Sequence, residues 1–347
     1  MSELQLALLT IGIGMIAVLY AYGWWQQRQY RRRFGEAFGS DRADALYQGL
    51  DAGLAQAPVA GAGGEMAATL LDESCTLLED RTDFIIELHL GEASLPSVLN
   101  GLWQRKFDFG KPVYICGQPL GGGKWERVIA DSPALYERFR ISLQLVDRGG
   151  AISAAKLADF RDLVTSIARQ IKADATVPDI DETQRRAARL DAFCADVDQM
   201  VGINLVPPGA RLLLGSKIAH AGALLGMTLE SDGAFHLLDA QGHSLFSLSN
   251  LDTQPFQHHL LETTGTMGIT LLLDVPRVDS PAVQFDRLMH IAHGLAKSLQ
   301  AELVDDHHIP LSESGLDRIR ERIAAVEAQM RDQGFAPGSA QARRLFS

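Results

Sequence analysis

Hydrophobic and polar residues alternate most clearly between His243 and Pro276, and this stretch predicts two strands of one sheet. The first strand runs from Ser244 with a period of two, and polar residues and Pro255 interrupt the chain after it. The second, from Ile269 to Val275, is almost entirely apolar, which is typical of a strand in the middle of a sheet. Pro276 ends it, because proline cannot donate a hydrogen bond to a neighbouring strand.

The second strand has two different faces. Alternation puts Ile269, Leu271, Leu273 and Val275 on one face, and Thr270, Leu272 and Asp274 on the other. The helix predicted directly after this strand can cover only one of them. We therefore expect Leu272, with Leu251 near it, on an uncovered sheet face, where apolar side chains are typical of a binding surface.

Beyond residue 80 the pattern predicts the same order of elements twice. Each copy has an opening strand, a helix, further strands, a long helix, a short extended segment and a final helix. The first copy is predicted with strands at 84–90, 113–116, 125–130 and 139–146, helices at 96–107, 153–172 and 181–197, and an extended segment at 176–179. The second is predicted with strands at 200–206, 224–229, 235–238, 244–248 and 269–275, helices at 210–221, 280–299 and 312–330, and an extended segment at 302–305.

Residue matches between the copies, such as 166–174 against 294–302, support a duplication. Two copies indicate tandem domains and not a solenoid, which needs about three repeats. Because helices are grouped after the sheet strands, the fold class predicted for each copy is α+β, an antiparallel-rich sheet with helices on one face. The predicted domains are 81–198 and 199–331, followed by a flexible tail at 332–347.

The amino terminus predicts a transmembrane anchor over residues 1–33. Leu4 to Trp25 contains no charge, and a helix of this length spans roughly 33 Å, close to the hydrocarbon thickness of a bilayer. Four arginines follow, at positions 28, 31, 32 and 33. By the positive-inside rule the amino terminus is periplasmic and the body cytoplasmic. Glu3 and Trp-Trp-Gln-Gln flank the apolar run, which argues against a cleaved signal peptide.

Charge and cysteine content narrow the class of partner. The chain of 347 residues has a net charge of −11. The charges of the first 33 residues sum to +3, so the remainder carries −14, which argues against a nucleic-acid partner.

Cys75, Cys116 and Cys194 are far apart and form no Cys-x-x-Cys pair, so we expect buried free thiols. Residues 34–80, rich in alanine and glycine, are predicted to be a flexible tether.

No residue pattern predicts catalysis, a metal site or a cofactor. Gly-Gly-Gly-Lys at 121–124 lacks the glycine and the Ser or Thr that a phosphate-binding loop requires. The adjacent pairs His258–His259 and His307–His308 are poor chelates, since neighbouring side chains on a strand point to opposite faces. Ser247 and His243 lack the strained turn of a nucleophile elbow. We expect no enzymatic activity, no cofactor, no metal and no small-molecule substrate.

The segments Leu-Phe-Ser-Leu-Ser-Asn-Leu and Thr-Met-Gly-Ile-Thr-Leu-Leu-Leu-Asp-Val-Pro, together with the anchor, resemble the ZipA family of bacterial cell-division proteins. The resemblance extends from about Met200 to Met330. It implies a split β-α-β fold whose sheet binds the carboxyl-terminal peptide of FtsZ in a shallow apolar groove. The implied partner-binding residues are Leu205, Phe235, Ser249, Leu251, Thr270 and Leu272.

The sequence departs from this family in two ways. The tether is short and Ala/Gly-rich where the family has a long Pro/Gln-rich linker, and the first copy is an additional, diverged domain without the Phe-Ser-Leu-Ser-Asn motif. The function that follows is a single-pass inner-membrane anchor of the division ring, with FtsZ and the lipid bilayer as partners. The alternatives are a membrane-tethered adaptor for another protein and, third, an enzyme or metal sensor that uses the histidine pairs.

Overall fold

The computed structural model describes residues 75–209, 211–252 and 254–347. All the elements described below lie within residues 75–347. Within the described residues, no helix combines the length and the apolar character needed to cross a membrane. The predicted anchor helix, Leu4 to Trp25, lies outside these residues.

The first sheet has the antiparallel strand order β3-β2-β4-β1-β7. Its strands are β1 (Asp83–Ser94), β2 (Val113–Pro119), β3 (Glu126–Arg127), β4 (Tyr136–Gln144) and β7 (Asp174–Thr176). A small hairpin of β5 (Val146–Asp147) and β6 (Gly150–Ala151) follows β4. The fold predicted for this part is confirmed at the level of an antiparallel sheet with helices.

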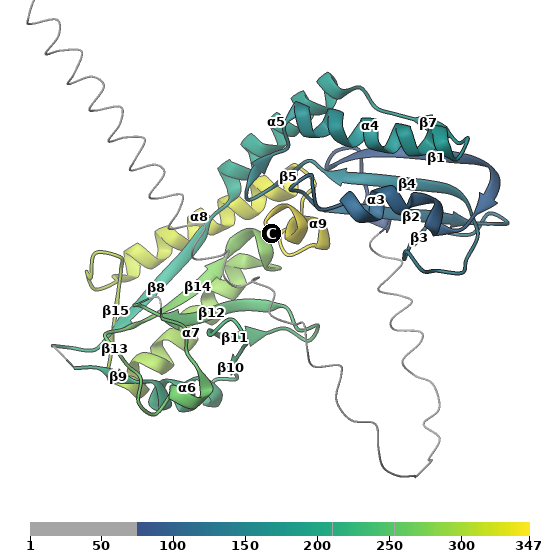
Figure 1. Cartoon of the computed structure of the whole chain (residues 1–347). Helices are drawn as coiled ribbons and strands as arrows, with labels where there is room; N and C mark the ends of the chain where they lie inside the picture. The colour runs from purple at the N-terminus through teal and green to yellow at the C-terminus, as the bar shows by residue number, and fades with distance from the viewer. Residues whose placement is uncertain (1–74, 210, 253) are drawn as a thin grey trace, which may run out of the picture. The chain divides into compact units, whose positions relative to one another are not determined.

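Helices cover one face of the first sheet (Figure 1). They are η2 (Pro96–Leu99), α3 (Asn100–Arg105) and α4 (Ala154–Gln170), and α5 (Ile180–Val197) follows β7. Phe84 and Phe160 meet edge to face at 6.2 Å between ring centroids, which joins β1 to α4. Burial of such aromatic and aliphatic side chains is the main stabilising term of this layer.

The second sheet has the strand order β10-β11-β12-β14-β8-β15 and is also antiparallel. Its strands are β8 (Met200–Val206), β10 (Thr228–Leu229), β11 (Phe235–Leu238), β12 (Ser244–Asn250), β14 (Ile269–Asp274) and β15 (Glu302–Val304). A separate ladder joins β9 (Leu213–Leu214) to β13 (Gly265–Thr266). The predicted central strand, β14, lies between β12 and β8.

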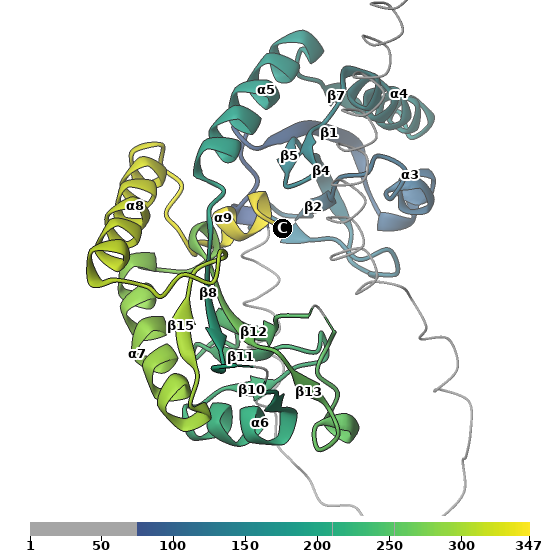
Figure 2. The same ribbon diagram turned by 90° about the vertical axis from the view of Figure 1, so that its left-hand side faces the viewer.

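The helices α6 (Gly215–Leu224) and α7 (Pro281–Leu299) lie on one side of the second sheet (Figure 2). Two 3₁₀ turns, η3 (His258–Leu260) and η4 (Val275–Arg277), precede β13 and α7. Helix α8 (Glu313–Asp332) contacts α7, and Ser312 caps it by accepting a hydrogen bond from the amide of Gly315 at 3.2 Å. The helix predicted at 312–330 is therefore present, with bounds that differ by at most two residues.

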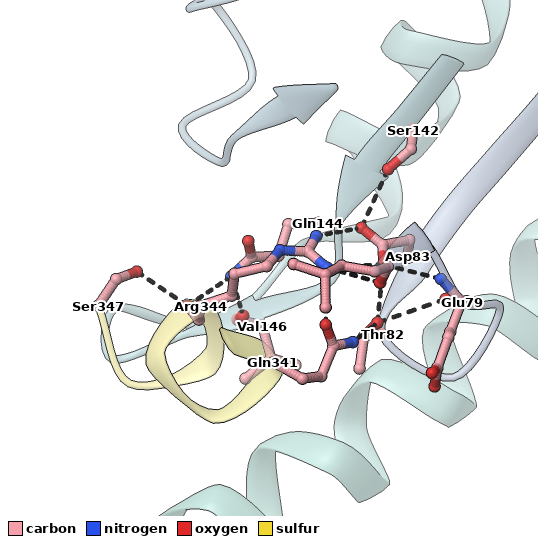
Figure 3. Close-up of polar contacts among 10 residues, drawn as sticks. Glu79, Thr82, Asp83, Ser142, Gln144, Val146, Gln341, Arg344 and Ser347 are labelled. Atoms are coloured by element: carbon pink, nitrogen blue, oxygen red, sulfur yellow. Dashed lines mark hydrogen bonds and ion pairs between the residues drawn. The ribbon is translucent and has the colours of Figure 1, made fainter. Parts of the chain in front are cut away.

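The predicted flexible tail at 332–347 is wrong, because these residues fold back onto the body. Helix α9 (Ala340–Leu345) follows α8, and Leu345 and Phe346 are buried. Arg344 Nη2 lies 2.7 Å from Asp83 Oδ1 at the start of the first sheet (Figure 3). The amide of Gly338 donates to the carbonyl of Pro276 after β14 at 3.0 Å. The carboxyl-terminal segment therefore holds the start of β1 and the turn that follows β14.

The cysteine prediction is wrong for two of three residues. Cys75 and Cys116 form a disulfide across a sequence separation of 41, whereas Cys194 is a buried free thiol as expected. Burial raises the pKa of the Cys194 thiol to about 12, and the carboxylates of Asp191 and Asp198 add to the shift. The tether also ends earlier than predicted, since Cys75 is buried against β2.

Candidate functional site: the open face of the second sheet

Burial alternates along β14, and this separates a covered face from an open one. Ile269, Leu271 and Leu273 are fully buried under the helices, whereas Thr270, Leu272 and Asp274 are only partly buried. Directly opposed residues of antiparallel strands lie on the same face. The register therefore assigns to the open face Met200, Gly202, Asn204, Ser247, Ser249, Thr270, Leu272 and Asp274.

Gly202 forms the floor of this face beside the two central side chains. A Cβ atom added to Gly202 would lie 3.7 Å from Thr270 Cγ2 and 3.9 Å from Leu272 Cδ1, which is ordinary van der Waals contact. The missing side chain thus leaves space over β8 next to Leu272. The face offers apolar and small side chains in the middle of a sheet, which suits the apolar side of a partner helix.

A chain of polar contacts borders one side of Thr270. Its hydroxyl donates to Asn204 Oδ1 at 2.7 Å, and Asn204 Nδ2 donates to Asp306 Oδ1 at 3.1 Å. Asn204 is buried, so these two bonds satisfy an amide that would otherwise be costly. Next to Asp306, the backbone amides of Ile309 and His307 donate hydrogen bonds to the Asp305 carboxylate. These bonds order the turn after β15 and lower the pKa of Asp305.

Leu251 lies at the end of the open face where β8 and β14 meet. A Cβ on Gly268 would come within 2.9 Å of Leu251 Cδ2 and 3.3 Å of Val206 Cγ2. The side chains of Leu251 and Val206 therefore converge over this glycine, and both are partly buried. They extend the apolar part of the face beyond Thr270.

An ion pair closes the opposite end of the β14 column. Arg148, in the turn between β5 and β6, donates to both oxygens of Asp274 at 2.7 and 2.8 Å. It also donates to Asp198 at 2.7 Å. Burial lowers the pKa of Arg148, but the hydrogen bonds and charges of the two carboxylates outweigh this and raise it. The β5–β6 hairpin therefore occupies the Asp274 end, and the accessible part runs from Leu272 towards Leu251.

The structure separates the six predicted site residues into two groups. Ser249, Leu251, Thr270 and Leu272 lie together on the open face and are partly buried. Leu205 and Phe235 lie on the covered face, opposite Ile269 and Leu248, with 0% and 3% exposure. Their side chains pack under the helices, so the predicted placement of these two residues beside Leu272 is wrong.

Sequence reasoning missed Gly202, Asn204 and Arg148. Pairing of β8 with β14 was predictable in kind, but its register was not, and the register decides which residue faces Thr270. Arg148 carried no local signal at all, because its partners lie 50 and 126 residues away.

The histidine pairs do not form a metal site among the residues that the structure describes. His258, His259, His307 and His308 are all exposed. No group of three or more His, Cys, Asp or Glu side chains that could hold a metal ion occurs in this part of the chain.

Comparison with known proteins concerns the same region. Residues 199–322 match the family model described as ZipA, C-terminal FtsZ-binding domain. The cell division protein ZipA of Ectopseudomonas mendocina is 30% identical over 167 residues, which are 45% of this chain and 59% of that protein. ZipA of Colwellia psychrerythraea is 26% identical over 142 residues, 37% of each chain.

ZipA of Haemophilus influenzae is 29% identical over 111 residues, 30% of this chain and 34% of that protein. The chain thus spans less than two thirds of the length of these relatives. The resemblance to ZipA that the strands around Leu272 indicate is confirmed, and the family match extends over residues 199–322.

Proposed function

We propose that the protein is a non-enzymatic anchor of the bacterial division ring, which binds the carboxyl-terminal peptide of FtsZ on the open face of the second sheet. The observation that carries the proposal is the exposure of Gly202, Thr270 and Leu272 in the part that matches the ZipA family model. The relatives are named cell division proteins, and their names state no catalytic activity.

An amphipathic helix of the partner would lay its apolar side over Leu272 and Leu251. Recognition of this kind uses apolar residues at spacings of three and four along the partner helix. A single small face gives modest affinity, but many anchors along one filament add avidity. Weak individual sites are therefore compatible with firm attachment of a polymer to a membrane.

The test is binding of a fluorescein-labelled FtsZ carboxyl-terminal peptide to the full chain in nanodiscs, measured by fluorescence anisotropy. Gly202→Leu would fill the space beside Leu272 without a backbone clash, and Leu272→Asp would place a charge in the apolar contact. We expect each change to weaken binding by more than about tenfold.

Matched controls separate loss of the site from loss of the fold. Gly91→Leu adds the same side chain on β1, where a Cβ meets no atom within 4 Å. Leu224→Asp adds the same charge on α6, where Leu224 is already 73% exposed. Wild-type affinity in a folded Gly202→Leu variant would remove this face from the proposal. Absence of saturable binding by the wild type would favour the adaptor alternative.

We also propose the predicted topology, with residues 1–33 as the anchor, a periplasmic amino terminus and a cytoplasmic body. The charge pattern around Leu4 to Trp25 supports it. The Cys75–Cys116 disulfide stands against it, since such bonds persist mainly in oxidising compartments. Protease added to intact spheroplasts decides the point: a cytoplasmic body is protected until the cells are lysed, and a periplasmic body is digested at once.

Finally, we infer that the two sheets are tandem split β-α-β domains, 81–198 and 199–331. The neighbouring strands β4-β1-β7 of the first sheet correspond to β14-β8-β15 of the second, which supports this. A long helix also lies at the same place along the chain in both, α4 between β4 and β7 and α7 between β14 and β15. The other edge of each sheet differs. In the first sheet, the strand that directly follows helix α3, β2, pairs with β4. In the second sheet, the last strand of the meander β10-β11-β12, β12, pairs with β14. Separate expression of residues 199–347 and its cooperative unfolding would test the division.

A further inference from the structure

The open face of the first sheet carries a row of charged side chains. Register places Arg127, Cys116, Arg140, Glu87 and Thr176 side by side across five strands. The next row contains Gln118, Arg138, His89 and Asp174. The helices α3 and α4 lie on the other face, where Phe84, Ile86 and Leu88 are fully buried.

The chain itself covers only one end of this face. Cys75 is bonded to Cys116, and Arg344 of α9 reaches Asp83 and the ring of Tyr114. Cys116 stands between Arg127 and Arg140 in the first row, so Cys75 reaches this row, but the side chains of Arg127, Arg138 and Arg140 are still partly or fully exposed. Arg127 is exposed and has no ion-pair partner within that part of the chain.

The arginines are held in place before any partner arrives. Arg140 Nε donates to Glu87 Oε1 at 2.6 Å, and Arg138 Nη2 donates to Glu87 Oε2 at 3.0 Å. The ring of Trp125 lies 4.3 Å from the Arg140 guanidinium. Each arginine side chain is still about one-third exposed, at 36% for Arg138 and 34% for Arg140. Fixed, partly exposed guanidinium groups lose little conformational entropy on binding.

One carboxylate, Glu87, balances only one of these three positive charges. The cluster Trp125, Arg127, Arg138 and Arg140 is therefore a basic patch on a protein whose net charge is −11. Arginine and tryptophan are also the residues that most often dominate binding energy in protein interfaces. A polyanion such as nucleic acid would be repelled by the acidic remainder of the molecule, whereas a short acidic peptide would meet only the patch.

The neighbouring part of the face limits where such a peptide lies. A hollow of about 610 Å³ on the β1–β7 side is bordered by three acidic residues, Glu79, Asp80 and Glu87, and by two arginines, Arg81 and Arg140. This mixed lining is less favourable to a run of carboxylates than the side that carries Arg127 and Arg138. An acidic segment is thus expected on the side formed by β2, β3 and β4.

From these observations we propose that Trp125, Arg127, Arg138 and Arg140 form a docking surface for an acidic peptide segment of a second protein partner. It is separate from the open face of the second sheet and has different chemistry. The first sheet would then give the anchor a second binding specificity, for carboxylate groups and not for an apolar helix.

The test uses the full chain in phosphatidylcholine nanodiscs and a fluorescein-labelled peptide of eight alternating aspartate and glutamate residues. Anisotropy should show saturable binding that an Asn/Gln peptide of equal length lacks. Arg127→Ala should weaken binding by about fivefold to tenfold, because Arg127 has no structural ion pair to lose. Trp125→Ala should weaken it as well, and Arg127→Lys should restore part of the affinity.

The matched control is Arg189→Ala on α5, which removes an exposed arginine without an ion pair among the described residues. It should bind the acidic peptide like wild type, and so should Gly202→Leu. Equal affinity of wild type and Arg127→Ala would overturn the proposal. So would absence of saturable binding, or tighter binding of a DNA oligonucleotide or of phosphatidylglycerol vesicles to the same residues.

Discussion

The two sheets share a layout but present different chemistry on their open faces. In both, three neighbouring strands have the same order, and helices bury the aliphatic face. The exposed row of the first sheet contains Arg127, Arg140 and Glu87, whereas the second has Leu272 beside Gly202. Side chains alternate between the two faces of each strand. One set therefore packs under the helices and stabilises the fold, and the other set is free to contact a partner.

Closure is the second difference. The chain's own carboxyl terminus and the segment from Cys75 cover one end of the first open face. On the second, a single arginine, Arg148, holds the Asp274 end, and the central positions stay accessible. Covered ends contribute stability and accessible centres contribute binding, so changes at the two places should affect different measurements.

The largest effect is expected from Asp83→Ala at the covered end of the first face. Asp83 is fully buried and pairs with Arg344, whose side chain is 12% exposed. Removing one member leaves an uncompensated buried charge, so the free energy of unfolding should fall by about 3 kcal/mol or more. Urea denaturation followed by circular dichroism measures it.

The control for Asp83 is Asp162→Ala, which removes an exposed partner of Arg161. It should cost less than about 0.5 kcal/mol. Similar losses for the two variants would show that α9 does not stabilise the first sheet through this pair. Binding of the FtsZ peptide should be unchanged in both, since neither residue lies on the second open face.

The second largest effect should follow Cys75→Ala. The disulfide closes a loop with a sequence separation of 41, and loss of a bond of this kind typically costs about 2–4 kcal/mol. The variant should unfold at lower urea than wild type without reductant, and the two should approach each other in dithiothreitol. Cys194→Ala, which removes only the free thiol and keeps the disulfide, should lose stability in dithiothreitol as wild type does, whereas Cys75→Ala should not respond to reductant. Identical curves for oxidised wild type and Cys75→Ala would contradict the prediction.

Local pattern predicted the elements well, and long-range pairing explains what it missed. Strands at 200–206 and 235–238 have the predicted bounds, because alternation is a property of the segment itself. The helix expected at 210–221 begins only at Gly215, since Leu213 and Leu214 pair instead with Gly265 and Thr266. No residue near Leu213 signals a partner more than fifty positions away.

The site was predictable for β14 and less so for its neighbours. Alternation alone placed Thr270 and Leu272 on the open face, and the structure agrees. Leu205 and Phe235 were assigned from resemblance, and their placement failed because one residue of register moves a side chain to the opposite face. At the carboxyl terminus the apolar Leu345 and Phe346 were a signal for burial, but the contacts of this segment come from the distant η4 turn and β5 of the hairpin.

A smaller effect is expected for Thr270→Val on the second open face. Valine keeps the shape but removes the hydroxyl that donates to Asn204 at 2.7 Å. The free energy of unfolding should fall by about 1 kcal/mol, because the buried amide oxygen of Asn204 loses its donor. Ser249→Ala is the control, since the Ser249 hydroxyl has no hydrogen bond among the described residues. Equal stability of Thr270→Val and wild type would mean that water replaces the threonine hydroxyl.

The smallest effect concerns pH and returns to the charged face of the first sheet. Burial raises the pKa of Glu87, but the hydrogen bond from Arg140 and the charges of Arg140 and Arg138 outweigh it, and the pKa lies below its usual 4.5. A carboxyl group with a lowered pKa in the folded state stabilises the fold above pH 4.5, and this contribution is lost as the pH falls through the folded-state value. Wild type should therefore lose more stability below pH 4.5 than Glu87→Gln does. Thermal unfolding between pH 7 and pH 3 measures the difference, with Glu92→Gln, a change at an exposed position of the same strand, expected to follow wild type. Parallel curves for Glu87→Gln and wild type would show that the arginines of the basic patch are not held by this carboxylate, and the preorganisation assigned to the patch would then have to come from Trp125 alone.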